Sequence, residues 1–80
     1  MHAATLLGYK RSSPFRPFRI VLNSGRQYDV RHPDFLEIGH DSAIFFFRQT
    51  PDSPHDRWET FSLTLIDHIE HLQSETATTR

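Results

Sequence analysis

The sequence predicts a small, mostly β protein in which about five antiparallel strands form a small barrel or a strongly bent sheet. Two observations support this fold class. Apolar and polar residues alternate in several short runs, and turn-forming residues separate those runs. We expect an N-terminal segment at 1–13, a β domain at 14–72 and a disordered polar tail at 73–80.

The segment 18–31 predicts a β-hairpin whose register follows from its loop. A two-residue loop would set Asp29 opposite Ile20, whereas a three-residue loop at 23–25 keeps the apolar residues on one face. That loop needs Gly25 in a left-handed conformation. The predicted cross-strand pairs are Leu22 with Arg26, Ile20 with Tyr28, Arg19 with Asp29, and Phe18 with Val30.

Further strands are expected at 35–38, 43–48 and 58–63, with a proline-containing flexible loop at 49–57. Residues 2–7 are expected to form one or two helical turns only if Leu6 and Leu7 dock on the sheet. Asp34 is placed to cap a turn after Pro33, and the His32 ring is expected to satisfy backbone groups at the strand end. The predicted inner face consists of Phe18, Ile20, Leu22, Tyr28, Val30, Phe61, Leu63 and Ile69.

Residues 64–72 fit two structures. Leu65, Ile66, Ile69 and Leu72 have helical spacing, but a bend at 64–67 followed by a strand at 68–72 also fits. We favour the bend and strand because of a family resemblance.

The resemblance is carried by residues 15–20, by the pair Gly25-Arg26 and by residues 30–35. These segments resemble a family of small uncharacterised bacterial proteins with a short N-terminal helix, a PFxPFxI motif, a DGR turn, a VxHPxF segment and a closing hI-x-x-IE strand. The chain departs from it at 23–25, where the family more often has Asp before Gly, and at the aromatic run 45–47. The resemblance implies a fold and no activity. More loosely, the strand order is similar to Sm-like and SH3-like barrels, but residues 66–68 do not match the RNA-contacting motifs of Sm-like proteins, so no RNA-binding residues are carried over.

Composition indicates a cytoplasmic protein without a membrane partner, because the chain has no cysteine and no apolar stretch of membrane-spanning length. The net charge is −1, yet six of the nine Lys and Arg residues precede His32, whereas nine of the ten acids follow it. The favoured interpretation is that the two halves pair with each other in the fold. The alternative is a basic binding face for nucleic acid, with Tyr28 or another aromatic as a stacking surface and the cations Arg16, Arg19, Arg26 and Arg31.

The sequence gives little support for a catalytic site or a metal site. The serines have no nucleophile-elbow surroundings, and no glycine-rich loop is present to hold a phosphate. Among six histidines the best cluster is His68 with His71, and on a strand these two point to opposite faces. We therefore expect no catalytic residues, no metal site and no cofactor.

The aromatic run 45–47 predicts an interaction surface. In a strand, Phe45 and Phe47 share one face while Phe46 lies on the other with Ile44. A sheet with one solvent-exposed face would therefore expose large apolar side chains to water. We expect a patch that includes Trp58, covered by the N-terminal segment, a second copy or another protein. The sequence thus predicts a non-enzymatic protein-interaction module, either a homo-oligomer or a protein docked on a larger partner, with the interface residues Phe45, Phe46, Phe47 and Trp58.

Overall fold

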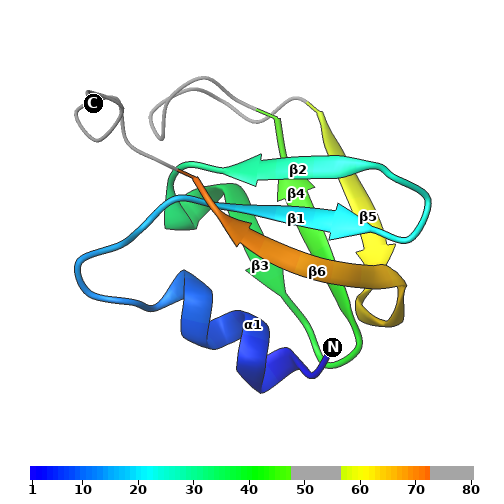
Figure 1. Ribbon diagram of the computed structural model, residues 1–80, viewed down its shortest axis with the longest axis horizontal. Helices are drawn as coiled ribbons and strands as arrows, with labels where there is room; N and C mark the ends of the chain where they lie inside the picture. Colours follow the sequence, from blue (N-terminus) through cyan, green and yellow to red (C-terminus); the bar gives the residue numbers. More distant parts are fainter. Residues whose placement is uncertain (48–56, 73–80) are drawn as a thin grey trace.

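The computed structural model describes residues 1–47 and 57–72. Six strands form two three-stranded antiparallel sheets, in the orders β2-β1-β6 and β3-β4-β5, beside one short helix (Figure 1). The elements are α1 (Ala3–Lys10), β1 (Phe18–Leu22), β2 (Gln27–Val30), β3 (Leu36–Ile38), β4 (Ser42–Phe46), β5 (Trp58–Ser62) and β6 (Ile66–His71). The mostly β fold with a short N-terminal helix is confirmed. The number of strands is six rather than about five, and within the described residues the two sheets do not close into a barrel.

The β1–β2 hairpin has the predicted register. Phe18 pairs with Val30, Arg19 with Asp29, and Ile20 with Tyr28. The Leu22 amide donates to the Arg26 carbonyl at 2.8 Å, and Gly25 in the loop has a φ of 93°. The alternation of apolar residues and the need for glycine at a positive φ together set this register.

The favoured bend and strand at the C-terminal end of the domain are confirmed. Leu63–Leu65 form a 3₁₀ turn, and β6 follows at once and pairs with β1. The Ser62 hydroxyl accepts a hydrogen bond from the Thr64 amide and caps the turn. β6 begins at Ile66, two residues earlier than expected, because Ile66 already pairs with Leu22 across a register shift. Pairing with β1 satisfies the backbone of β6, so the helical spacing of its apolar residues does not decide its structure.

The second sheet begins after a 3₁₀ turn at Pro33–Phe35. The expected role of the His32 ring is confirmed, since His32 Nδ1 accepts a hydrogen bond from the Asp34 amide. His32 is thereby the cap of this turn, a role that the sequence predicts for Asp34. Phe45 then pairs with Leu36 on β3 and with Glu59 on β5. Arg48, most of the predicted loop 49–57 and the predicted disordered tail 73–80 lie outside the described residues.

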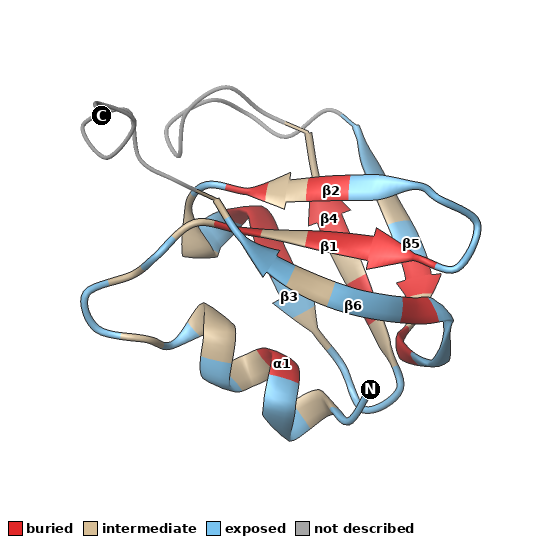
Figure 2. Cartoon of the chain, in the orientation of Figure 1, coloured by how far each residue is buried: buried red, intermediate tan, exposed pale blue. Residues whose placement is uncertain are grey.

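The core lies between the two sheets, whose strands cross at a steep angle (Figure 1), and buried segments of both sheets face it (Figure 2). Tyr28 of the first sheet stacks on Phe61 of the second, with ring centroids 4.7 Å apart. All residues of the predicted inner face are buried except Ile69, which is partly buried because β6 is an edge strand of its sheet. Val21 alternates with the inner-face residues Ile20 and Leu22, yet it is also buried, between its strand partners Gln27 and His68.

Helix α1 packs along one side of the two sheets, next to β3 (Figure 1). Leu6 is completely buried in the core, and Lys10 forms an ion pair with Glu37 of β3 at 3.6 Å. This docking stabilises a helix of eight residues, which is too short to be stable alone. Within the described residues, no helix has the length and apolar character needed to cross a membrane.

Candidate functional site

The structure divides the predicted interface residues between the two faces of β4. Phe45 is buried in the core, and Phe47 packs against that core with its ring centroid 4.9 Å from that of Phe45. The Arg57 guanidinium lies over the Phe47 ring at 4.2 Å. Phe45 and Phe47 therefore serve the interior and do not form an exposed patch with Trp58, because the inward face of β4 meets Tyr28 of the other sheet.

The outer face of β4 and β5 carries the exposed part of the predicted set. Phe46 is directly opposite Trp58 in the strand pairing, and Ile44, two residues before Phe46, lies on the same face. Trp58 is 56% exposed, whereas Ile44 and Phe46 are partly exposed. These three residues, Ile44, Phe46 and Trp58, are called the outer patch below.

The outer patch borders the edge of β5. β5 pairs with β4 on one side, and within residues 1–47 and 57–72 no strand pairs with its other side. Natural proteins protect such edges with charges, proline or short strands. β3 has only three residues, and β6 carries Asp67 and Glu70, but β5 has five residues with Glu59 as its single charge. Among the described edge strands, β5 is therefore longer than β2 and β3 and carries fewer acids than β6.

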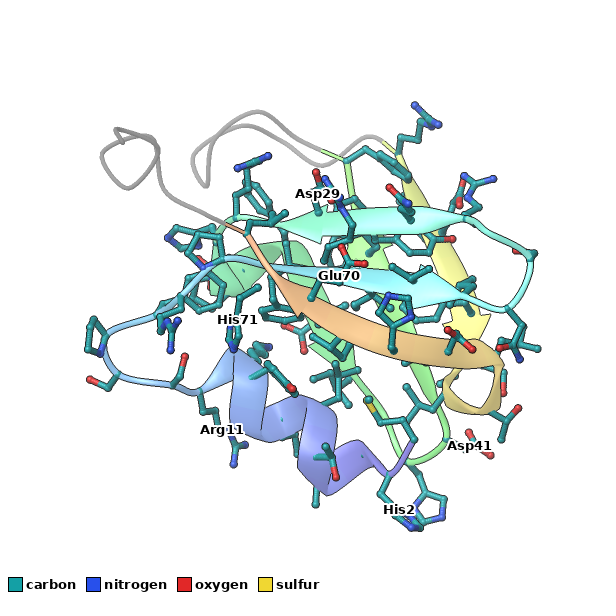
Figure 3. All side chains as sticks on the ribbon, in the orientation of Figure 1. His2, Arg11, Asp29, Asp41, Glu70 and His71 are labelled. Carbon is teal, nitrogen blue, oxygen red and sulfur yellow. The ribbon has the colours of Figure 1, made fainter. Side chains whose placement is uncertain are left out.

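Arg19 and Arg31, from the predicted basic face, contribute to an ion-pair network on the outer surface of the first sheet. Arg19 Nε donates to Asp29 Oδ1 at 2.7 Å, Arg31 lies 3.5 Å from Asp29, and Glu70 lies 3.6 Å from Arg19. Figure 3 shows Asp29 and Glu70 on this surface. The hydrogen bond from Arg19 lowers the pKa of Asp29, and the same contact raises the pKa of Arg19.

Arg26 belongs to a different cluster that joins the two sheets. Its guanidinium forms an ion pair with Glu59 of β5, and the Tyr28 hydroxyl donates to the other oxygen of that carboxylate at 2.9 Å. Burial of the ring, followed by its contact with Glu59, raises the pKa of Tyr28. Sequence reasoning missed this cluster. The signal was present, because the alternation along the strand places Glu59 on the inner face with Phe61 and Leu63. A carboxylate on an inner face needs a partner.

Arg16 lies apart from the other predicted basic residues, in the loop before β1, and among the described residues it forms no ion pair. The four arginines thus do not form one continuous face. Within the described residues, three ion pairs instead join cations of the first half to acids of the second half, namely Lys10–Glu37, Arg19–Glu70 and Arg26–Glu59. These contacts support the interpretation that the two halves pair with each other.

The histidine cluster at the end of the domain is an ion-pair site. His68 Nδ1 lies 2.7 Å from Asp67, and His68 Nε2 lies 2.8 Å from Glu70. The contact with Glu70, followed by that with Asp67, raises the pKa of His68. Both ring nitrogens are therefore occupied by carboxylates. No group of three or more metal-ligating side chains with suitable geometry occurs in residues 1–47 and 57–72.

Comparison with known proteins finds no matching family model, no similar curated protein and no similar solved structure. The interpretation of the outer patch therefore rests on its own chemistry. An exposed tryptophan and a partly exposed phenylalanine, beside a strand edge that no described strand pairs with, offer apolar area and backbone hydrogen-bonding groups.

Proposed function

We propose that the chain is a non-enzymatic protein-interaction module that binds through the outer patch and the edge of β5. The observation that carries the proposal is the exposure of Trp58 at the end of that edge, directly opposite Phe46. Tryptophan is enriched among the residues that dominate binding energy at interfaces. An extended strand of a partner can complete the ladder of β5 while its side chains pack beside Trp58.

The partner that fits this edge without a charge conflict is a second copy of the chain. If two β5 strands pair antiparallel about a two-fold axis at Thr60, each Trp58 lies opposite Ser62 of the other copy. Glu59 then faces Phe61 of the other copy, so no like charges meet. The product is a six-stranded sheet that extends β3-β4-β5 across the axis. Docking on a larger protein partner is the alternative form of the same function.

Light scattering coupled to size-exclusion chromatography tests self-association by measuring the mass of the full chain over a range of concentrations. We expect a dimer that Trp58→Ser converts to a monomer, because the serine removes apolar area from the interface. Leu65→Ser is the matched control, since Leu65 is 47% exposed in the turn before β6 and lies outside the outer patch. It should leave the mass of the dimer unchanged.

Charge at position 60 tests the register. Thr60→Lys and Thr60→Glu should each be monomeric, because two equal charges would meet at the axis. An equimolar mixture of the two variants should form a heterodimer. A wild-type chain that stays monomeric at every concentration, or a dimer that none of these changes weakens, contradicts pairing through β5.

The proposal extends to the class of fold and to location. We propose that the two sheets are the halves of an SH3-like or Sm-like small barrel, in a cytoplasmic member of the bacterial family that the sequence motifs resemble. The hairpin, the 3₁₀ turn before β6 and the pairing of β6 with β1 support this assignment. Binding of nucleic acid is the less favoured function, because Arg19, Arg26 and Arg31 are already engaged by carboxylates.

A further inference from the structure

A second candidate site is an open surface pocket, called the cavity below, between α1, the loop before β1 and the end of β6. Its volume is about 360 Å³, and Thr5, Gly8, Tyr9, Ser12, Arg16 and His71 line it. This volume lies within the range of small-molecule sites, about 300–1,000 Å³. Figure 3 shows His71 at the end of β6, beside the C-terminal half of α1. The cavity is separate from the outer patch, since none of its lining residues belongs to β4 or β5.

One wall of the cavity is aromatic and firmly held. The Tyr9 ring packs against the buried Phe18, with centroids 5.4 Å apart, and against His71, with centroids 5.5 Å apart. A ring fixed by two neighbours offers an apolar surface to a flat molecule at low entropic cost.

Gly8 leaves open space next to this wall. A Cβ atom built on Gly8 would meet no atom within 4 Å, so the packing of the protein does not require glycine there. Glycine inside a helix lowers its stability relative to alanine. Gly8 thus lowers the stability of α1, but it leaves the cavity open to a ligand that approaches the backbone.

The described lining of the cavity includes one cationic side chain, Arg16, and no acid. Arg16 has no ion pair among the described residues. The Thr5 hydroxyl and the His71 ring add polar groups, whereas the Ser12 hydroxyl already donates to the Tyr9 carbonyl at 3.1 Å. An unpaired guanidinium favours a planar or tetrahedral anionic group as its partner.

We propose that this cavity binds a small organic anion with a flat apolar body. The anionic group pairs with Arg16, and the body lies over Gly8 against the Tyr9 ring. The site would give the module a small-molecule ligand, independent of the protein contact at the outer patch.

Three probes of nearly equal shape and different charge test the proposal. Benzoate is anionic, benzamide is neutral and benzamidinium is cationic, and each is titrated into the full-length ¹⁵N-labelled chain. We expect saturable shifts of the Gly8, Tyr9 and Ser12 amide signals with benzoate, and about 3- to 10-fold weaker binding of benzamide. Benzamidinium should bind least. Phenyl phosphate, compared with benzoate, shows whether a phosphate or a carboxylate fits better.

Variants distinguish binding in the cavity from nonspecific attraction of an anion to basic residues. Arg16→Gln should reduce benzoate affinity to that of benzamide, and Gly8→Leu should remove binding of all probes by filling the cavity. Arg31→Gln changes an exposed arginine that is paired with Asp29 and does not line the cavity, so it should leave binding unchanged. Equal affinity for benzoate and benzamide, or an equal loss in Arg16→Gln and Arg31→Gln, overturns the proposal.

Discussion

At the scale of single residues, Asp29 shows how the charge segregation of the sequence is used. Its carboxylate accepts hydrogen bonds from Arg19 and from Arg31, and its side chain is about one-third exposed. The hydrogen bond from Arg19 lowers the pKa of Asp29, against the opposing effect of partial burial. A carboxylate with a lowered pKa in the folded state stabilises the fold above its unfolded pKa, and this contribution disappears as pH falls through the folded pKa.

Asp29→Asn tests this contribution. We expect the free energy of unfolding to fall by about 1 kcal/mol or less at neutral pH, because the pair is partly exposed. The difference between the variant and the wild type should shrink as pH falls below about 4, where Asp29 of the unfolded wild-type chain becomes protonated. Urea unfolding at several pH values measures this difference in the free energy of unfolding. Asp41→Asn, at an exposed turn, is the control and should match the wild type. A deficit of constant size down to pH 2 would contradict the assignment.

At the scale of elements, the sequence predicted the structure correctly where turn chemistry and the alternation of apolar residues agree. The β1–β2 register could be derived because one loop length keeps apolar residues together and places Gly25 at a positive φ. The residue that caps the turn before β3 could not be derived in this way, since His32 and Asp34 are both able to accept a hydrogen bond from a backbone amide. The choice between helix and strand at 64–72 was open for a related reason. Its spacing fits a helix, and only pairing with β1 decides for a strand.

Alanine at two glycines should have opposite effects on stability. Gly25→Ala should destabilise the fold by about 1–2 kcal/mol, because its φ of 93° is unfavourable for a residue with a Cβ atom. Gly8→Ala should stabilise it by up to about 1 kcal/mol, because α1 gains helix propensity and the Cβ meets open space. Urea unfolding of both variants, each compared with the wild type, measures the effects. A loss of stability in both variants would contradict the open space at Gly8.

At the scale of the whole molecule, the limits of the sequence lie in the contacts between elements. Strand parity correctly divided Phe45 and Phe47 from Phe46, but it could not tell which face is interior because both faces of β4 are apolar. The first sheet decides, since its Tyr28 packs on Phe45 and Phe61 and turns that face of β4 inward. The cavity at Arg16 was beyond prediction as well. It exists only because α1 docks close to the end of β6.

Leu6 is the residue of α1 that is buried in the core. It is completely buried and belongs to the single core cluster that both sheets share. Leu7, the next residue, is only partly buried. Because the core is continuous from the helix to both sheets, loss of the Leu6 side chain should weaken the whole domain rather than release the helix alone.

We therefore expect Leu6→Ala to lower the global free energy of unfolding by about 2–5 kcal/mol. This is a large share of the total of roughly 4–12 kcal/mol typical for a domain of 80 residues. Leu7→Ala is the matched control and should cost clearly less, because part of its side chain stays in water. Urea unfolding gives both values, and amide hydrogen exchange shows where stability is lost. If exchange in Leu6→Ala accelerates only within α1 while β1 and β4 keep their protection, the helix is an attachment and not part of the cooperative core.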